Sequence, residues 1–325
     1  MKKVLGIGNA LVDIIIRLDN DDILKEYNLP KGAMQLVNRD FISKILERTA
    51  GMIKQVSSGG SAANTIHGLA HLGVPVAYIG KVGNDDFGRI FEDDLKINNI
   101  YPFLYKSNTD TGRAIALVSP DSERTFSTYL GSAIELTPDD LKEELFHGYD
   151  YFHIEGYLVQ NHELIKTAVQ MAYKNKLKIS LDLASYNVVE ENKEFLNDII
   201  SRYVDIVFAN EDEARALTGI EQPNEALFQI ANKCEIAIVK LGAQGSIIKK
   251  AEFYSKVNAV TVQSIDTTGA GDLYAAGFLY GLVQKLPLTK CAEIGSIVAS
   301  KVVEVIGAKI SNEKWSDINN TIAKL

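Results

Sequence analysis

Over much of the second half of the chain, short apolar runs alternate with longer segments whose apolar residues recur at helical spacing. The short runs predict strands and the longer segments predict helices. Strands separated by helices predict a mostly parallel central sheet with helices on both faces, so we expect an α/β fold. The expected strands are 151–155, 178–182, 206–209 and 236–240, and the expected helices are about 163–175, 192–203, 211–218 and 225–232. Short strand-like runs follow within 246–262, and helices are expected at 272–284, 289–305 and 312–324.

The first 130 residues have a less regular pattern. Strands are expected at 4–8, 11–18, 34–37 and 76–81, and helices at 39–50, from the glycine turn at Gly59 to Gly73, and at 87–97. Two strand-like runs, 113–119 and 124–130, are joined by the turn sequence Ser119-Pro120-Asp121-Ser122, which predicts an antiparallel hairpin. We expect residues 11–37 and 102–130 to form a small β-sheet lid, inserted into one α/β domain that spans residues 1–325.

Composition narrows the class of protein without identifying an activity. The chain has 325 residues, of which 46% are hydrophobic and 23% are charged, as in an ordinary globular protein. Its formal net charge of −8 and the lack of a basic block argue against a nucleic-acid or anionic-membrane partner. Cys234 and Cys291 have neither a metal-binding spacing nor a disulfide framework, which predicts a cytoplasmic protein. No apolar run reaches the length of a transmembrane helix.

The most informative stretch is 265–282, which reads IDTTGAGDLYAAGFLYGL. An apolar, strand-like run ends at Asp266, a turn of small residues follows, and apolar residues continue at helical spacing after Asp272. A strand, a glycine-rich turn and a helix start together direct unpaired backbone N–H groups at an anion. An acid beside a bound anion is unusual, so we interpret Asp272 as a proton acceptor next to a transferring phosphoryl group. The alternative is an acidic first turn that only complements the helix dipole.

Four ordered motifs resemble those of the ribokinase family of carbohydrate and nucleoside kinases, also called the pfkB type. The most specific motif is the run of seven residues from Asp266 to Asp272. The others are Gly59-Gly60 followed by Asn64, the N-x-x-E sequence from Asn210 to Glu213, and the turn from Val239 to Gly245. The resemblance covers nearly the whole chain. It implies a ribokinase-like fold and transfer of the γ-phosphoryl group of ATP to a primary hydroxyl.

Within this family, the motifs are most similar to those of the adenosine kinase branch. The opening sequence from Gly8 to Asp13 resembles that of the branch, and Ser61 follows Gly59-Gly60, where ribokinases usually have lysine. We therefore expect the acceptor to be the 5′-hydroxyl of a nucleoside, adenosine above all, in purine salvage. A sugar kinase that acts on ribose, fructose or a sugar acid is the alternative within the family.

The resemblance also implies roles for individual residues. Asp272 would accept the hydroxyl proton, and backbone N–H groups of Gly269, Ala270, Gly271 and Asp272 would hold the charge that develops on the phosphoryl oxygens. The acceptor site would be formed by Asn9, Asp13, Gly59, Gly60, Asn64 and Tyr157. An ordinary core tyrosine is the alternative for Tyr157. The ATP site would be formed by Asn210, Glu213, Lys240, Gly242, Gly245, Asp266, Thr268 and Arg124. A similar role on the lid is considered for Arg113.

The resemblance implies that Asn210 and Glu213 lie near Mg²⁺ and contact it through water, because Mg²⁺ keeps several of its waters. Asn210 can equally cap a helix whose first turn is acidic, and the two interpretations are compatible. Many members of the family also bind a monovalent cation such as K⁺ near the position of Asp266. The sequence leaves that cation open, as it does the choice between a monomer and a homodimer.

Two functions from other classes compete with the kinase hypothesis. A catalytically silent sensor that binds a nucleoside or ATP is opposed by the intact Gly-Ala-Gly turn and Asp272. A dinucleotide-dependent dehydrogenase is suggested by Gly6 and Gly8, but Leu11 occupies the position of the third glycine.

Overall fold

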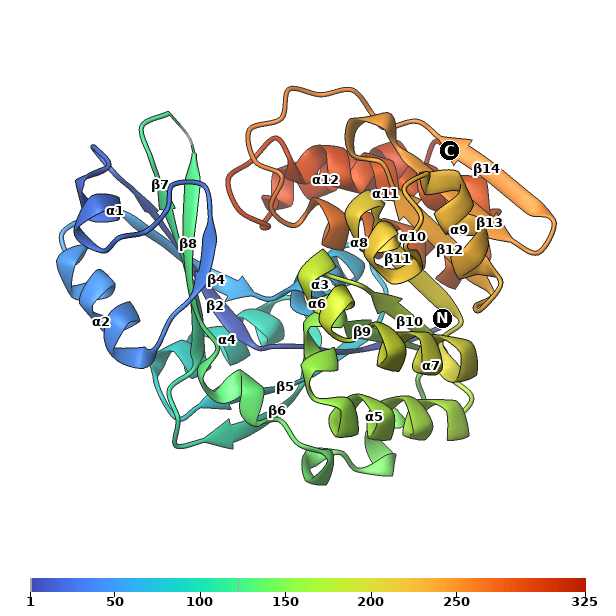
Figure 1. Cartoon of the computed structure of the whole chain (residues 1–325), viewed down its shortest axis with the longest axis horizontal. Helices are drawn as coiled ribbons and strands as arrows, with labels where there is room; N and C mark the ends of the chain where they lie inside the picture. The colour runs from blue at the N-terminus through green and yellow to red at the C-terminus, as the bar shows by residue number, and fades with distance from the viewer. Residues whose placement is uncertain (1, 122) are drawn as a thin grey trace.

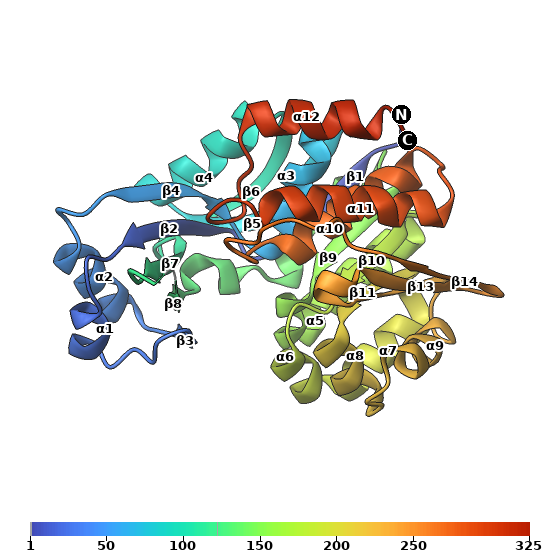
Figure 2. The same ribbon diagram turned by 90° about the horizontal axis from the view of Figure 1, so that it is seen from above.

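The computed structural model describes residues 2–121 and 123–325, and within them two sheets organise the molecule (Figures 1 and 2). The large sheet has nine strands in the order β14-β13-β12-β11-β10-β9-β1-β5-β6. The seven strands from β12 to β6 in this order pair in parallel with their neighbours. At the other edge, β13 pairs antiparallel with both β12 and β14. The strands are β1 Val4–Ile7, β5 Val76–Gly83, β6 Ile100–Ser107, β9 Tyr151–Glu155, β10 Lys178–Asp182, β11 Ile206–Asn210, β12 Ile236–Lys240, β13 Ser246–Lys250 and β14 Phe253–Val257.

Helices cover both faces of this sheet (Figure 2). One layer contains α3 Ser61–His71, α4 Asp86–Ile97, α10 Ala270–Val283, α11 Leu288–Val302 and α12 Asn312–Ile322. The other contains α5 His162–Lys174, α6 Tyr186–Glu191, α7 Lys193–Tyr203, α8 Glu211–Thr218 and α9 Pro223–Ala231. Adjacent strand residues enter opposite cores: Phe208 packs in the cluster with α3 and α10, and Val207 packs in the cluster with α5 and α7. This burial on both faces explains the continuous apolar runs of the strands and confirms the predicted fold class.

The second sheet has five described strands in the order β3-β8-β7-β2-β4, and α1 Asp22–Glu26 and α2 Arg39–Arg48 lie beside it. Its strands are β2 Leu11–Arg17, β3 Met34–Leu36, β4 Lys54–Gly59, β7 Gly112–Val118 and β8 Arg124–Tyr129. In β2, Val12, Ile14 and Ile16 are buried, while the alternate residues are partly exposed. Asp13 is therefore on the face opposite the buried apolar row.

The structure corrects the predicted elements at three places. Residues 102–107 belong to β6 of the large sheet, where they pair with β5, and not to the small sheet. The small sheet instead includes β4, which was not predicted. No strand ends at Asp266: β14 ends at Val257, and residues 258–269 are irregular. The predicted β7–β8 hairpin is antiparallel as expected, but its turn includes Ser122, which lies outside the described residues.

Candidate active site

A cavity of about 1360 Å³ lies between the small sheet and the carboxyl ends of the parallel strands. This is the edge of an open α/β sheet where ligands usually bind. Its walls bring together Asp13 from β2, Asn64 from α3, Lys240 from β12 and Asp272 from α10. The cavity is larger than a typical site for one small ligand and can hold two substrates side by side.

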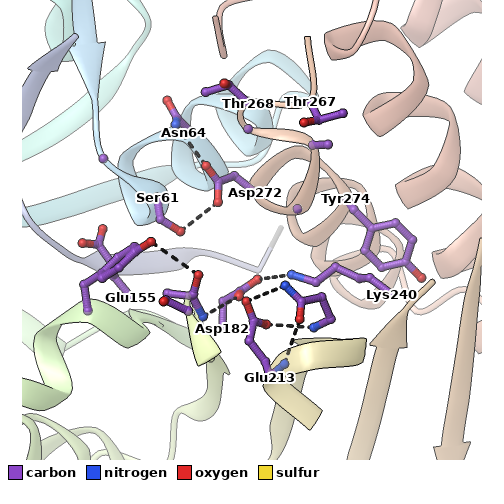
Figure 3. Close-up of a pocket in the computed structure, with 18 of the residues that line it drawn as sticks. Ser61, Asn64, Glu155, Asp182, Glu213, Lys240, Thr267, Thr268, Asp272 and Tyr274 are labelled. Atoms are coloured by element: carbon purple, nitrogen blue, oxygen red, sulfur yellow. Dashed lines mark hydrogen bonds and ion pairs between the residues drawn. The ribbon is translucent and has the colours of Figure 1, made fainter. Parts of the chain in front are cut away.

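Asp272 occupies the centre of the cavity, in the first turn of α10 (Figure 3). Its carboxylate accepts hydrogen bonds from Ser61 Oγ at 2.8 Å and from Asn64 Nδ2 at 3.0 Å. Burial raises the pKa of Asp272 to about 6, and these two hydrogen bonds oppose the shift. A carboxylate with a pKa this close to neutrality is suited to accept a proton from a substrate hydroxyl.

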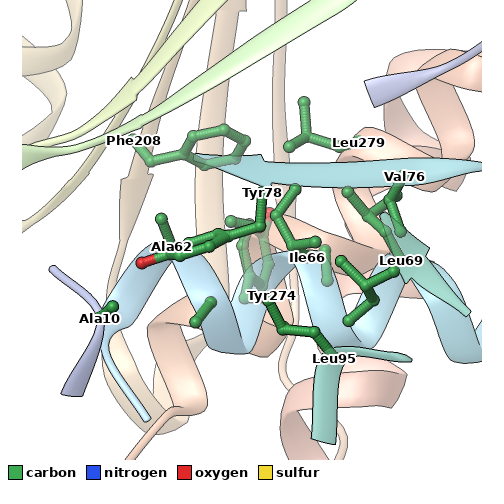
Figure 4. Packing of buried hydrophobic residues seen from close by; sticks show 14 of the residues in the cluster. Ala10, Ala62, Ile66, Leu69, Val76, Tyr78, Leu95, Phe208, Tyr274 and Leu279 are labelled. Atoms are coloured by element: carbon green, nitrogen blue, oxygen red, sulfur yellow. The ribbon is translucent and has the colours of Figure 1, made fainter. Parts of the chain in front are cut away.

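Helix α3 holds the two donors to Asp272 in place through its apolar packing (Figure 4). Ile66 and Leu69 of α3 belong to a buried cluster that also contains Val76 and Tyr78 of β5. The helix begins after Gly60, whose φ is +96°, and a Cβ at Gly60 would lie 2.3 Å from the carbonyl oxygen of Asn9. A residue with a side chain is therefore excluded at the helix start, because it would be both strained and blocked.

The glycine-rich turn before Asp272 is the anion cradle that the sequence predicts. Gly269 has a φ of +75°, and a Cβ there would lie 2.6 Å from the Cβ of Ala308. The N–H of Ala270 donates a hydrogen bond to the carbonyl of Thr267 at 3.1 Å. It is therefore not free to bind a phosphoryl oxygen, contrary to the prediction. Gly271 and Asp272 follow in the first helical turn, where N–H groups have no intrahelical acceptor. The N–H groups of Gly271 and Asp272 are therefore available to a bound anion.

Arg124, on β8 of the small sheet, reaches across to the start of this turn. It forms an ion pair with Asp266 and donates a hydrogen bond to the hydroxyl of Thr268. The carboxylate of Asp266 also accepts from the backbone N–H groups of Thr268 and Gly307, each at 2.6 Å. The structure thus brings Arg124, Asp266 and Thr268 together, with Asp266 as the anchor of the turn.

The end of the cavity that contains Asn9 and Asp13, where the acceptor site was predicted, is called the acceptor end, and it also contains a carboxyl that was not predicted. Glu155 ends β9 and is buried, and it accepts hydrogen bonds from Asn9 Nδ2 at 2.8 Å and from the N–H of Ala62 at 3.0 Å. Burial raises the pKa of Glu155 to about 7. Glu155 therefore joins the loop after β1 to the start of α3. Its position at the end of a buried strand was the only signal in the sequence.

Asp13 lies directly over Gly59, where an added Cβ would be 2.2 Å from its carboxyl carbon. Burial raises the pKa of Asp13 to about 7. Tyr157 lines the same cavity, and its hydroxyl donates to the carbonyl of Ala184 at 3.4 Å. The apolar side chains at this end come from Leu11, Met34, Leu36, Ile134 and Leu136.

At the other end, Lys240 and the N-x-x-E pair are held by neighbours. Lys240 Nζ donates to Asp182 at 2.8 Å and lies 3.0 Å from the position of a Cβ on Gly271. Asn210 and Glu213 form a capping box, with three mutual hydrogen bonds of 2.8 Å. The helix-cap interpretation of Asn210 is therefore observed, while burial raises the pKa of Glu213 to about 7. Gly242 and Gly245, with φ of +54° and +93°, shape the turn after Lys240 and line the cavity.

Arg113 is not brought to the cavity. It is buried, forms an ion pair with Asp110 at 3.2 Å and packs against the rings of Phe87 and Tyr129. The role considered for it at the phosphates is therefore wrong. Within residues 2–121 and 123–325, no group of three or more His, Cys, Asp or Glu side chains could hold a metal ion. A Mg²⁺ ion at this site would need phosphate oxygens and water among its ligands, which is the usual arrangement for Mg²⁺.

The chain belongs to the pfkB family of carbohydrate kinases, whose family model matches residues 40–315. It is therefore a kinase that acts on a sugar or nucleoside and uses a hydroxyl group as acceptor, and membership of the family implies ATP as phosphoryl donor. No helix in the described part of the chain is long and apolar enough to cross a membrane.

Individual relatives include both sugar and adenosine kinases. An adenosine kinase structure from Sinorhizobium meliloti is 35% identical, with a TM-score of 0.86 over 97% of this chain and 98% of that one. A probable sugar kinase structure from Rhizobium etli is 34% identical, with a TM-score of 0.89 over 100% of this chain and 99% of that one. A 5-dehydro-2-deoxygluconokinase from Geobacillus kaustophilus is 27% identical, over 89% of each chain.

Proposed function

We propose that this protein transfers the γ-phosphoryl group of ATP to the 5′-hydroxyl of a nucleoside, with adenosine as the preferred acceptor. The observation that carries the proposal is the chemistry of the acceptor end of the cavity. Its polar groups include the carboxyls of Asp13 and Glu155 and the amides of Asn9 and Asn64, and they lie beside the apolar side chains of Leu11, Met34, Leu36, Ile134 and Leu136. Carboxylates and amides can bind the hydroxyls of a ribose, and apolar side chains can cover a flat base.

Charge argues against an anionic acceptor. Lys240 is the basic residue among the described side chains that line the cavity, and it is paired with Asp182. Arg124 is paired with Asp266, and Arg113 is buried against Asp110. A sugar acid would need a cation for its carboxylate. The similarity to the adenosine kinase of Sinorhizobium meliloti supports the same choice of acceptor.

In the proposed reaction, Asp272 takes the proton from the acceptor hydroxyl as the oxygen attacks the γ-phosphorus. A bond forms between that oxygen and phosphorus, the bond to the bridging oxygen of ADP breaks, and ADP leaves with its electron pair. The N–H groups of Gly271 and Asp272 stabilise the charge on the transferring group. Lys240 lies near Gly271 and adds a positive charge on the same side. Mg²⁺, when bound with ATP, would neutralise phosphate charge, and Asn210 and Glu213 are the side chains proposed to hold its waters.

A sugar kinase is the second candidate. It is supported by the curated relatives, which include the 5-dehydro-2-deoxygluconokinase above and a probable fructokinase from Arabidopsis thaliana that is 30% identical over 71% of this chain. A sugar kinase would use Asp13 and Asp272 in the same way and would leave the apolar part of the acceptor end without a ligand.

ADP release with a panel of acceptors tests the proposal. The panel contains adenosine, other nucleosides, ribose, fructose and 5-dehydro-2-deoxygluconate, each with ATP and Mg²⁺. We expect kcat/KM for adenosine to exceed that for ribose by at least about tenfold, since a base adds apolar area worth several kcal/mol at about 25 cal/mol per Å². Faster phosphorylation of any sugar than of every nucleoside would leave the family intact and overturn the nucleoside assignment.

A further inference from the structure

The carboxylate of Asp266 joins three segments of the chain around the predicted anion cradle. It accepts hydrogen bonds from the backbone N–H groups of Thr268, in the glycine-rich turn, and of Gly307, in the loop between α11 and α12, each at 2.6 Å. It also forms an ion pair with Arg124 of β8, whose guanidinium donates to the hydroxyl of Thr268 as well. The Asp266 side chain is 1% exposed and that of Arg124 is 16% exposed, so the ion pair is largely buried. Arg124 thus brings a permanent positive charge from the small sheet to the start of the cradle.

Other oxygen atoms around this turn also accept hydrogen bonds. The carbonyl of Val303 accepts from the N–H groups of Ile265 at 2.7 Å and of Asp266 at 3.2 Å, and the carbonyl of Thr267 accepts from Ala270 at 3.1 Å. A potassium ion in a protein is held by several oxygen atoms that replace its water shell. Here the oxygens face N–H groups and a guanidinium, whose positive charge repels a cation. The residues around Asp266 therefore do not fit a monovalent cation.

The loop between α11 and α12, which carries one of these N–H donors, is held on both sides. On one side Ala308 packs against Gly269, where an added Cβ would lie 2.6 Å from the Ala308 Cβ. On the other side Lys309 Nζ donates to Ser58 Oγ of β4 at 2.9 Å and lies 3.7 Å from Asp94 of α4. Freeing the oxygens for a cation would require the loop to break several of these contacts at once.

We propose that the guanidinium group of Arg124 supplies the positive charge at Asp266 that many members of the family take from a monovalent cation, so that this kinase does not require K⁺. The planar guanidinium is always charged and can donate to Asp266 and Thr268 at once. It neutralises the single negative charge of the Asp266 carboxylate. A second cation on the same buried carboxylate would have no partner charge, and burying an unpaired charge is costly.

Arg124 is in this view a positioning residue for the cradle. It belongs to β8 of the small sheet, whereas Asp266 and Thr268 belong to the turn before α10. The ion pair and the hydrogen bond to Thr268 hold that turn, and with it the N–H groups of Gly271 and Asp272 that follow. This role rests on the ATP-dependent phosphoryl transfer of the proposed function and not on the choice of acceptor.

The salt dependence of ADP release tests the role of Arg124. Protein freed of K⁺ and Na⁺ is assayed with the best acceptor of the panel, the tetramethylammonium salt of ATP and magnesium chloride. The added salt is KCl, NaCl or tetramethylammonium chloride at one ionic strength, and ADP is measured by chromatography without coupling enzymes. We expect kcat/KM for ATP to differ by less than about twofold among the three salts, because they screen charge equally. A gain in KCl beyond that range overturns the proposal.

Variants of Arg124 test whether its charge is what matters. In Arg124→Met, assayed in tetramethylammonium chloride, we expect kcat/KM for ATP to fall about 10²-fold, as when a catalytic group is misplaced by about 1 Å. Arg124→Lys keeps the charge but not the planar fork and should lose less. The control, Arg202→Met, removes an arginine from an exposed ion pair with Asp198 and should leave both the rate and its salt dependence unchanged.

Two outcomes with these variants overturn the proposal. One is a rate near that of the wild type in Arg124→Met without K⁺, which would show that the charge at Asp266 is not needed. The other is an equal loss in Arg124→Met and Arg124→Lys, which would show that the arginine acts through its shape alone.

A binding measurement on the wild-type protein separates this inference from the proposed function. Thallium(I) takes the place of K⁺ in oxygen sites, and its ²⁰⁵Tl NMR signal reports binding without catalysis. In nitrate buffers, with and without Mg²⁺ and a non-hydrolysable ATP analogue, we expect no shift or broadening of the signal that K⁺ reverses. Binding of one thallium ion per chain that K⁺ reverses overturns the inference, whichever acceptor is phosphorylated. Failure of the nucleoside assignment in the acceptor panel would leave this result unchanged.

Discussion

Asn64 donates a hydrogen bond from Nδ2 to the carboxylate of Asp272 at 3.0 Å, while its own Oδ1 is buried without a hydrogen-bond partner. The contact fixes the amide orientation, since only the NH₂ end can donate. Asn64 is thus held with an acceptor atom free in a buried site, and this is costly unless a ligand or water supplies a donor. A hydroxyl of the bound acceptor is suited to that role.

Removing the proton acceptor should remove the chemistry and spare binding. In Asp272→Asn we expect kcat to fall by about 10²–10⁴, the usual cost of losing a general base, with acceptor affinity within a few-fold. ADP release gives kcat, and calorimetry gives the affinity. The matched control is Asp317→Asn, on the exposed surface of α12. A kcat near that of the wild type in Asp272→Asn would remove Asp272 from the mechanism.

The hydrogen bond from Asn64 should be visible in the pH dependence. It lowers the pKa of Asp272, which burial raises to about 6, so activity should fall as the pH drops through about 6 and the base becomes protonated. In Asn64→Ala we expect this acid limb of the kcat profile to move to higher pH. The measurement is kcat at saturating substrates from pH 5 to pH 9. A limb that stays in place, or moves to lower pH, contradicts the assignment.

We expect Asp13 to lower the stability of the folded protein at high pH and to contribute to acceptor binding. Its pKa is raised to about 7 in the folded state, so the folded protein holds a proton that the unfolded chain has released, and stability is lost as the pH rises from about 4 to above 7. Asp13→Asn should therefore raise the free energy of unfolding at pH 8, by about 1–3 kcal/mol, and by less at pH 5. The same variant should lose about ten- to hundredfold in acceptor affinity, with ATP affinity spared.

Denaturant unfolding at the two pH values and calorimetry with each substrate are the measurements for Asp13→Asn. Relative to the wild type, Asp317→Asn should change the free energy of unfolding by the same small amount at pH 5 and at pH 8. Loss of ATP binding with intact acceptor binding would show that Asp13 belongs to the other end of the cavity.

The effects of substituting Lys240 and Asp182 on stability should depend on each other, whereas the loss of kcat should depend on Lys240 alone. Lys240→Met leaves the buried Asp182 carboxylate without its partner, which costs about 3–5 kcal/mol for a buried pair. The double variant Lys240→Met/Asp182→Asn should recover part of that stability. It should not recover kcat, because the charge beside Gly271 is still missing. Recovery of both quantities together would limit Lys240 to a structural role.

We also propose that the small sheet moves as a lid. Closure over both substrates would exclude water and protect ATP from hydrolysis. Hydrogen exchange in β7 and β8 should slow when adenosine and a non-hydrolysable ATP analogue are both present, and less with either alone. The strands of the large sheet, such as β10, serve as the internal control. Exchange in β7 and β8 that is the same with and without saturating ligands would contradict a lid.

The sequence predicted the parts of this fold that depend on local pattern. The buried strands β9 to β12 and the helices between them follow from periodicity, because both faces of each strand are apolar. The sequence did not predict β4, which reads Lys-Gln-Val-Ser-Ser-Gly and has one large apolar residue, Val56. That strand is held by pairing with β2, and strand pairing leaves no mark in local composition. The run before Asp266 has strand-like residues but no partner strand, so it stays irregular.

The same distinction explains the site. The glycine-rich turn and Asp272 were found because backbone geometry restricts the residue types at each position. Glu155 and Lys309 were missed because nothing in their neighbouring sequence distinguishes them from ordinary polar residues. Their surroundings depend on tertiary contacts: Glu155 meets the start of α3, and Lys309 meets β4 and α4. The role considered for Arg113 at the phosphates was wrong for the same reason, because its burial against Asp110 also depends on tertiary contacts that the sequence does not reveal.

The contacts that build the site join residues far apart along the chain. Ser61 and Asp272 are separated by 211 positions, Arg124 and Thr268 by 144, and Ser58 and Lys309 by 251. Contacts of such long range form slowly, because a large part of the chain must be ordered before they can close. During refolding from denaturant, helical circular dichroism should therefore recover well before ADP release does. A chain truncated after α11 would lose the loop whose Gly307 N–H binds the Asp266 carboxylate, so newly synthesised protein gains its active site only once nearly the whole chain is available.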